Sequence, residues 1–259
     1  MGFSDELLSQ DSFLGGQLTV HQPKAGYRAG VDPVFLAASV PAQPGETVLE
    51  LGCGAGVACL CLGSRVDGVT LTGVELQREY AVLARRNSAE NGVPLEVIEG
   101  DIAVLPAALR QRSFDHVIAN PPYFLRENGS SATNEGRETA LGERTPLSVW
   151  VDVAMRRLVH RGRLTMIQRA ERLPELLSAL DARAGNIEVL PLAPRAGRTA
   201  RLVLLRAIKS GRGPFALLPP VTLHEGAFHD ADRESYTPEV KAVLRDGAAL
   251  AWPEARRFG

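Results

Sequence analysis

Short apolar runs alternate with amphipathic segments through residues 46–210. The apolar runs have the length and composition of buried strands, and they are TVLEL (47–51), VTLTGVE (69–75), LEVIEGD (95–101), FDHVIAN (114–120) and RLTMIQ (163–168). Segments with helical spacing lie at 56–65, 77–91, 146–159 and 171–184. Two β-rich segments, 187–194 and 199–208, then flank a turn and predict a hairpin. This order predicts an α/β fold with a seven-stranded, doubly wound, Rossmann-like sheet, mostly parallel with an antiparallel last strand.

The segments on either side of this alternation carry weaker patterns. Residues 1–45 contain four prolines and several glycines, which predicts loops and one helix near 32–40. Residues 211–259 predict an extension with a short helix after Thr237-Pro238, and the polar residues 126–145 predict a long loop. We therefore expect one domain, in which 1–45 pack on the ligand site, 46–210 form the core and 211–259 extend it.

Composition and charge narrow the class of protein. A hydrophobic fraction of 45% and a charged fraction of 23% are those of a globular chain. The net charge of −1 argues against a surface that coats nucleic acid or membrane throughout. We expect no secretory signal in MGFSDELLSQD, and no apolar run is long enough to span a membrane. Three cysteines within residues 53–61 predict a reduced, cytoplasmic protein, and five scattered histidines predict no metal site.

A glycine-rich turn, Glu50-Leu51-Gly52-Cys53-Gly54-Ala55-Gly56, follows the first predicted strand. Alternating glycines let the backbone turn sharply and approach a ligand closely. Val57 replaces the glycine that a dinucleotide fingerprint needs, and no Lys-Ser/Thr pair of a phosphate loop follows. Glu75 and Asp101 end the next two strands. Three acids at successive strand ends disfavour a diphosphate and favour a cationic nucleoside such as S-adenosylmethionine, with Glu75 on the ribose hydroxyls.

The fourth strand ends in Asn120-Pro121-Pro122-Tyr123-Phe124. The two prolines stop the strand and leave carbonyl acceptors beside the Asn120 carboxamide. Acceptors grouped in this way suit a planar amine, whose transfer chemistry needs alignment more than a strong base. The rings of Tyr123 and Phe124 can stack on a nucleobase.

These two motifs resemble those of the class I S-adenosylmethionine-dependent methyltransferases that act on planar amino groups. The segments Phe13-Leu14-Gly15-Gly16 and 22–32 (QPKAGYRAGVD) are similar to the N-terminal segment of the bacterial tRNA adenine-N6 methyltransferases, which modify the adenosine next to the anticodon of a valine tRNA. The resemblance covers roughly residues 12–245. It implies S-adenosylmethionine as cofactor and tRNA as partner.

The resemblance also implies roles for particular residues. The cofactor contacts it implies are Arg28, Glu50, Gly52, Cys53, Gly54, Glu75, Leu76, Asp101, Ile102 and Asn120, with the Arg28 segment closing over the methionine end. It implies amine contacts by Asn120, Pro121, Pro122 and Tyr123. Many relatives have Asp at the position of Glu50, and the extra methylene should be tolerated.

Basic residues gather in the second half of the chain. Residues 190–224 contain no Asp or Glu but six basic residues, Arg195, Arg198, Arg201, Arg206, Lys209 and Arg212. If the sixth strand is parallel, the hairpin tip with Arg195 and Arg198 lies on the ligand side, where we expect it to contact phosphate.

Three alternatives stay open from the sequence. A protein glutamine-N5 methyltransferase shares Asn-Pro-Pro-Tyr but carries a longer N-terminal helical domain. A ribosomal RNA or DNA adenine methyltransferase is the second, and a cofactor-binding sensor without catalysis is the third. The intact Asn120-Pro121-Pro122-Tyr123 motif argues against the sensor.

Overall fold

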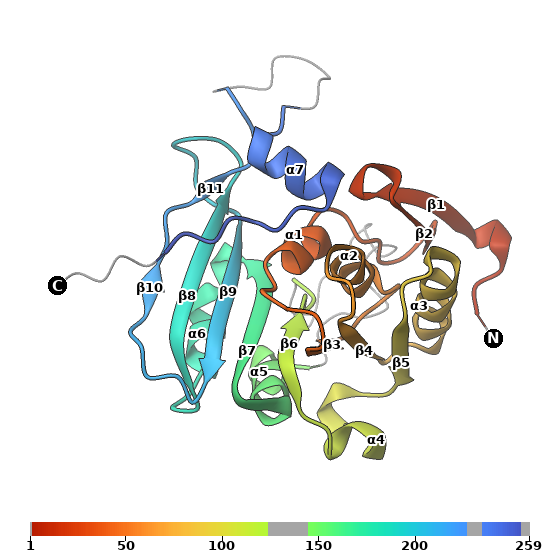
Figure 1. Cartoon of the computed structure of the whole chain (residues 1–259), viewed down its shortest axis with the longest axis horizontal. Helices are drawn as coiled ribbons and strands as arrows, with labels where there is room; N and C mark the ends of the chain where they lie inside the picture. Colours follow the sequence, from red (N-terminus) through yellow and green to blue (C-terminus); the bar gives the residue numbers. More distant parts are fainter. Residues whose placement is uncertain (1, 124–144, 227–234, 255–259) are drawn as a thin grey trace, which may run out of the picture.

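The computed structural model describes residues 2–123, 145–226 and 235–254. A central sheet of nine strands has the order β10-β8-β9-β7-β6-β3-β4-β5, with β11 paired to β8 (Figure 1). Its strands are β3 (Thr47–Leu51), β4 (Thr70–Glu75), β5 (Leu95–Glu99), β6 (Phe114–Ala119), β7 (Leu158–Arg169), β8 (Ala184–Ala193), β9 (Leu202–Lys209), β10 (Ala216–Leu217) and β11 (Val221–Thr222). β9 runs antiparallel to both β7 and β8, and the other pairings are parallel.

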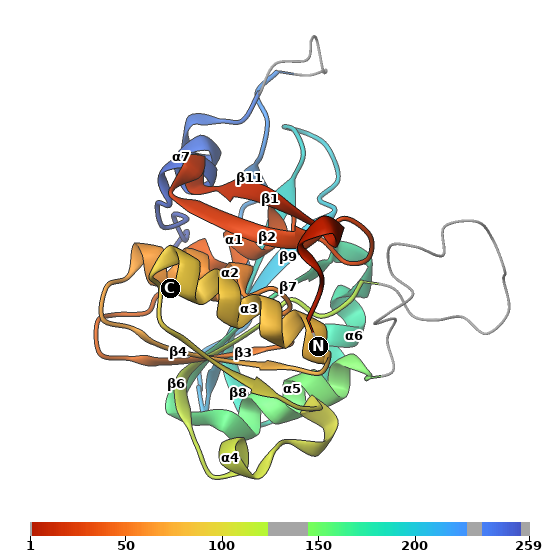
Figure 2. The same cartoon turned by 90° about the vertical axis from the view of Figure 1, so that its right-hand side faces the viewer.

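Helices cover both faces of this sheet, as Figure 2 shows. The α-helices are α1 (Asp32–Ala38), α2 (Val57–Arg65), α3 (Arg78–Asn91), α4 (Ala107–Arg110), α5 (Leu147–Arg157), α6 (Leu173–Ala179) and α7 (Pro238–Asp246). Short 3-10 helices lie at Asp5–Leu7, Leu14–Gly16, Ile102–Val104 and Ala170–Arg172. α1 and α2 pack with α7 in one apolar cluster that includes Val48, whereas α5 and α6 share the opposite cluster with Leu49 and Leu51. Side chains that alternate along β3 therefore pack into both halves of the core.

The predicted fold class is confirmed, with one change in the number of strands. The seven predicted strands are all present, and the last of them, β9, is the antiparallel one. Two short strands, β10 and β11, extend the sheet beside β8. Each pairs through two residues, so no apolar run long enough to predict a strand marks them. The helix predicted at 171–184 is shorter, since β8 already begins at Ala184.

The prediction of loops for residues 1–45 is wrong in one respect. β1 (Leu8–Phe13) and β2 (Leu18–Pro23) form an antiparallel ribbon. Its turn contains Gly15 and Gly16, whose φ angles of +65° and +98° favour glycine. The sequence LSQDSF lacks the regular alternation of a half-buried strand, which is why the pattern missed it. The helix predicted near 32–40 is present as α1, and α7 starts where predicted, capped by Thr237.

A buried asparagine on α3 anchors this ribbon to the core. The Asn87 side chain accepts a hydrogen bond from the His21 amide (2.9 Å) and donates to the His21 carbonyl (3.1 Å) and the Ala55 carbonyl (3.0 Å). Asn87 is completely buried, and Ala55 belongs to the glycine-rich turn. One side chain thus joins the N-terminal ribbon to the ligand-facing turn of the sheet.

Among the residues that the structure describes, no helix has both the length and the apolar character needed to cross a bilayer.

We expect Asn87→Ala to lower the free energy of unfolding by about 2–3 kcal/mol, because it leaves buried backbone groups of His21 and Ala55 without partners. Asn91→Ala is the matched control, since Asn91 bonds the Thr19 backbone in the same two-way manner at the exposed end of the ribbon. Its cost should stay below about 1 kcal/mol. Urea unfolding measures both, and equal costs would contradict the anchoring role of Asn87.

Candidate functional site

The carboxyl ends of four neighbouring strands bring most of the predicted site residues to one edge of the sheet. β3 lies between β6 and β4, and β5 follows β4. Glu50 and Gly52 lie at the end of β3, Glu75 ends β4, and Asp101 follows β5. Asn120 follows β6 on the other side of β3. Helices α2 and α5 lie on opposite faces of the sheet here (Figure 2), and doubly wound sheets bind ligands at this edge.

The glycine-rich turn is held open by its neighbours. Gly52, Gly54 and Gly56 have φ angles of +64°, +54° and +87°. A Cβ atom on Gly52 would lie 2.7 Å from the Trp150 ring, so this position must be glycine for packing as well as conformation. A Cβ on Gly54 would meet Tyr27 at 3.8 Å, which is ordinary contact. The turn therefore rests on Trp150 and leaves space beside Gly54.

The Glu75 carboxylate fixes the turn from the neighbouring strand. One of its oxygens accepts the Gly54 amide at 2.8 Å, and the other accepts the Gln77 amide at 2.8 Å. Burial raises the pKa of Glu75, and these backbone hydrogen bonds oppose the increase. The Leu76 amide also bonds this carboxylate, which can accept about four hydrogen bonds, so Glu75 keeps capacity for a ribose hydroxyl without releasing the turn.

Glu50 is a second buried acid at the same edge of the sheet. One of its oxygens accepts the Cys59 amide at 3.1 Å near the start of α2. Burial raises the pKa of Glu50 to about 8, with a further contribution from the charge of Glu75. The two buried carboxyl groups, of Glu50 and Glu75, fit a ligand that carries positive charge.

The remaining predicted cofactor residues continue along the same edge. Asp101 caps the Ile102–Val104 turn through a 2.7 Å bond from the Ala103 amide. Ile102 is buried, while Leu76 beside Glu75 is 53% exposed and presents an apolar surface that a nucleobase could cover. Cys53 is buried and packs under Gly73, where a Cβ would lie 2.6 Å from its sulfur.

The Asn120-Pro121-Pro122-Tyr123 turn lies across β3 from these acids. The Asn120 amide nitrogen donates to the Tyr27 hydroxyl at 3.4 Å, which leaves the amide oxygen as an acceptor. The carbonyls of Pro121 and Pro122 are less free than the sequence suggested. The Pro121 carbonyl accepts from Gln168 Nε2 at 3.4 Å, and the Pro122 carbonyl from Arg172 at 3.1 Å. Each still has one lone pair for a substrate.

The Tyr123 side chain is also held on several sides. Its hydroxyl donates to the Asp32 carboxylate at the start of α1. The Arg169 guanidinium lies over its ring, 5.4 Å from the centroid. Burial, and then the negative charge of Asp32, raise the pKa of Tyr123, so the phenol stays protonated. Phe124 lies outside the described residues.

Several residues that shape this site carried no sequence signal for such a role. Asp32-Pro33 is an ordinary helix start, and Trp150 has the spacing of a core residue. The sequence groups Arg169 and Arg172 only with the other basic residues of 156–172, and Gln168 lies in an apolar strand without a signal of its own. Their contacts depend on the pairing of β6 with β7, which the sequence pattern does not specify.

Arg28 is held by residues of the N-terminal ribbon. Its guanidinium donates to the Ser9 hydroxyl (2.7 Å), the Pro23 carbonyl (3.0 Å) and the Asp11 carboxylate (2.6 Å). These bonds hold the side chain against the β1–β2 ribbon. Its contact with the cofactor stays a prediction.

The basic residues of the hairpin divide between the two edges of the sheet. β8 is parallel to β7, so the loop that follows it lies at the carboxyl edge. There Arg195 bonds the carbonyls of Glu225 and Gly226, whereas Arg198 and Arg201 are exposed. The other three face elsewhere. The Arg206 guanidinium stacks on the Trp252 ring, 3.5 Å from its centroid, and burial lowers the pKa of Arg206 to about 9. Lys209 ends β9 at the amino edge of the sheet, and Arg212 follows it there.

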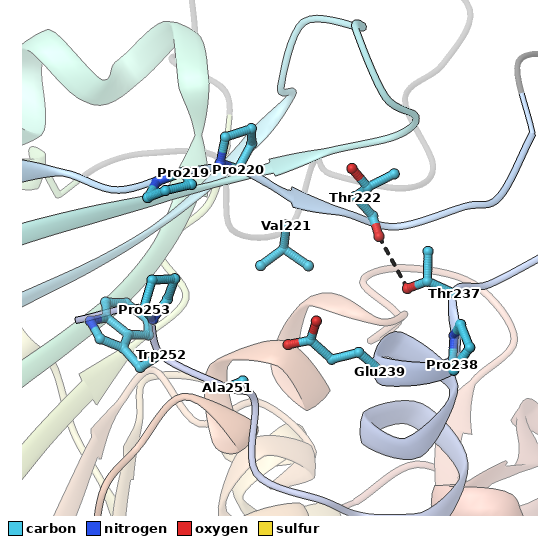
Figure 3. A pocket seen from close by; sticks show the side chains of 10 residues that line it. All are labelled: Pro219, Pro220, Val221, Thr222, Thr237, Pro238, Glu239, Ala251, Trp252 and Pro253. Carbon is cyan, nitrogen blue, oxygen red and sulfur yellow. Dashed lines mark hydrogen bonds between the residues drawn. The ribbon is translucent and has the colours of Figure 1, made fainter. Parts of the chain in front are cut away.

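A cavity of about 580 Å³ lies away from this edge, between β11, the start of α7 and residues 251–253 (Figure 3). Prolines, threonines and Trp252 line it, and Glu239 is the one charged residue among its described lining residues. None of the predicted site residues lines it, so the strand ends remain the candidate site.

The chain belongs to the methyltransferase small domain family, whose profile matches residues 30–191. Among curated relatives, the tRNA1(Val) (adenine(37)-N6)-methyltransferase of Photorhabdus laumondii is 33% identical over 137 residues, or 52% of this chain and 55% of the relative. The Haemophilus influenzae protein of the same name is 27% identical over 238 residues, or 89% of this chain and 95% of the relative. The chain thus spans about half the length of the relative it matches at higher identity.

Solved structures share the fold. A predicted O-methyltransferase from Agrobacterium tumefaciens is similar with a TM-score of 0.68 and 28% identity, over 88% of this chain and all of that one. The 16S rRNA N2 G1207 methyltransferase of T. thermophilus, solved with AdoMet and guanosine, has a TM-score of 0.53 and 22% identity over 78% of this chain and 50% of that one. The family and fold are those of S-adenosylmethionine-dependent methyltransferases, and the buried acids, open turn and exposed Leu76 fit that cofactor.

We expect the affinity for S-adenosylmethionine to rise from pH 6 to 7.5. The free protein holds Glu50 protonated below its pKa of about 8, and a bound cation favours the carboxylate, so binding releases a proton. The association constant should rise by up to tenfold per pH unit in this window. Calorimetry in buffers of different ionisation enthalpy measures the proton release.

Glu50→Gln is the matched variant for this measurement, because it keeps the shape and removes the titration. Its affinity should be lower and nearly independent of pH. A slope equal to that of the parent protein would show that Glu50 is not the linked group.

Proposed function

We propose that this protein transfers a methyl group from S-adenosylmethionine to N6 of an adenine in tRNA, and that the target is the adenosine next to the anticodon of a valine tRNA. The observation that carries the proposal is the position of the Asn120 amide oxygen and the Pro121 carbonyl beside the glycine-rich turn and its acids. The names of the relatives from Photorhabdus and Haemophilus support the finer choice of acceptor.

S-adenosylmethionine, when bound, supplies an electrophilic methyl group on a sulfonium. Glu75 accepts the ribose hydroxyls, and the charges of Glu50 and Glu75 favour the cation over neutral analogues. The Asn120 oxygen and the Pro121 carbonyl each accept one N–H of the adenine amine, which turns the nitrogen lone pair out of conjugation. Tyr123 offers a ring face to the base, worth about 1–3 kcal/mol and comparable with the cost of extruding it. Positioning of this kind can supply about 7–11 kcal/mol.

The acceptor pair favours an amine over a hydroxyl. An amine has two N–H groups for the two acceptors, whereas a hydroxyl has one O–H and would leave an acceptor unpaired in a partly buried site. The name of the Agrobacterium structure, a predicted O-methyltransferase, is therefore not the activity that this turn suits.

Arginines beside the same turn support an RNA acceptor: Arg198 and Arg201 are exposed, and Arg169 is half-buried. Ala170 donates its amide to the Arg201 carbonyl at 2.9 Å, directly after Arg169, whose guanidinium covers Tyr123. Arg198 lies in the same loop before β9. We call Arg169, Arg198 and Arg201 the arginine band. It gives a polyanion a contact next to the proposed base site.

The proposed function is tested by transfer of labelled methyl from S-adenosylmethionine to unmodified bulk tRNA, followed by digestion and mass spectrometry of nucleosides. We expect label in N6-methyladenosine and a single labelled tRNA after separation. Asn120→Ala should lower the rate at least a hundredfold, because it removes an acceptor for the amine, while cofactor affinity stays within threefold. Label confined to protein glutamine, to ribosomal RNA or to no acceptor would overturn the proposed function.

We expect Arg198→Glu combined with Arg201→Glu to raise the KM for tRNA by at least tenfold and to reduce the dependence of KM on salt, since fewer counterions are released. Arg110→Glu combined with Arg212→Glu is the matched control, because both residues are exposed and lie away from the carboxyl edge. Equal effects of the two pairs would remove the arginine band from RNA binding.

A further inference from the structure

The N-terminal segment before α1 touches the Asn-Pro-Pro-Tyr turn at two points. Tyr27 accepts the Asn120 amide N–H at 3.4 Å, and Asp32 accepts the Tyr123 hydroxyl. Asp32 is the first residue of α1, whose following residues are buried in the core, so its backbone is fixed. The two contacts join a segment that precedes the sheet to the end of β6, its fourth strand in the chain order of the core.

We propose that Asp32 is a positioning residue of the base site: its carboxylate holds the Tyr123 hydroxyl and thereby fixes the ring on which the target adenine stacks. This inference rests on the proposed function. A tyrosine ring can rotate about two side-chain bonds, and a hydrogen bond from its far end to a fixed carboxylate removes that freedom before the base arrives.

The other surroundings of Tyr123 decide which ring face is left for the base. Arg169 lies over one face at 5.4 Å and is attracted both by the ring and by the charge of Asp32. In this proposal the base stacks on the face that Arg169 does not cover. Asp32, Tyr123 and Arg169 come from α1, the turn after β6 and the end of β7, so three separate elements set one ring plane.

Four variants test this role through the coupling between Asp32 and Tyr123. They are Asp32→Ala, Asp32→Asn, Tyr123→Phe and the double variant Asp32→Ala with Tyr123→Phe. We expect Asp32→Ala and Tyr123→Phe each to lower kcat for tRNA about tenfold or more, since each removes a hydrogen bond to a charged group. The double variant should be no slower than the slower single variant, because both changes remove the same contact.

Two further readouts separate positioning from a general structural effect. Asp32→Asn keeps an oxygen acceptor and should recover most of the rate that Asp32→Ala loses. The Kd for S-adenosylmethionine should stay within about threefold of the parent value in all four variants. Asp67→Asn, at an exposed position after α2, is the matched control and should leave the rate unchanged.

The outcomes are distinguishable from failure of the proposed function. If the parent protein methylates tRNA and Asp32→Ala is as harmful in the Tyr123→Phe background as alone, Asp32 does not act through the hydroxyl and the inference is wrong. The same holds if Asp32→Asn is as slow as Asp32→Ala. If Asp32→Ala does not fold, a fifth variant, Asp32→Asn with Tyr123→Phe, decides: a rate equal to that of Tyr123→Phe alone supports the inference, and a clearly lower rate overturns it. A parent protein that methylates no RNA would overturn the proposed function, and this inference with it.

Discussion

The Glu75 carboxylate joins two neighbouring strand ends, and the geometry of the candidate site depends on that link. Through the amides of Gly54 and Gln77 it ties the turn after β3 to the end of β4. The turn between Gly52 and Gly56 is left-handed at its three glycines and has few regular hydrogen bonds of its own, so an external acceptor is what gives it a single conformation. A rigid turn at this place fixes the start of α2, where the Cys59 amide donates to the Glu50 carboxylate.

The same arrangement makes ionisation of two acids unfavourable in the free protein. Burial raises the pKa of both Glu50 and Glu75, which means that their ionised forms are disfavoured until a cation arrives. A folded-state pKa above the unfolded value makes the contribution of Glu50 to stability largest below pH 4 to 5 and smaller as the pH rises towards 8. Buried groups whose pKa is shifted in this way are common in binding sites, because a complementary ligand stabilises the ionised form.

The sequence was sufficient for those features that depend on local pattern. The apolar runs that became β3 to β9, the glycine-rich turn and the Asn-Pro-Pro-Tyr turn are each contained within a few consecutive residues, and the parallel β/α rule then places their ends at one edge. The ribbon of β1 and β2 was missed because its sequence lacks regular alternation, and because Asn87, which anchors it, lies 66 positions from its partner His21. Arg195 was assigned to a hairpin tip on the ligand side, and its bonds to the carbonyls of Glu225 and Gly226 could not be predicted from its neighbours in the sequence. Asp32 and Arg169 became part of the site through pairing of distant elements.

Opposite charges are separated within a chain whose net charge is −1. Glu50 lies in β3 and Glu75 ends β4. The arginine band lies beyond β6, next to the end of β7 and the start of β9. Tyr123 stands between the two groups, since Asp32 holds its hydroxyl and Arg169 covers its ring. Under the proposed function, a cationic cofactor and an anionic polynucleotide would be attracted to adjacent parts of one edge without competing for the same groups. The methyl group would then pass from one ligand to the other at the boundary between the two potentials, so the separation of charge along the strand order would also set the position of the reacting atoms.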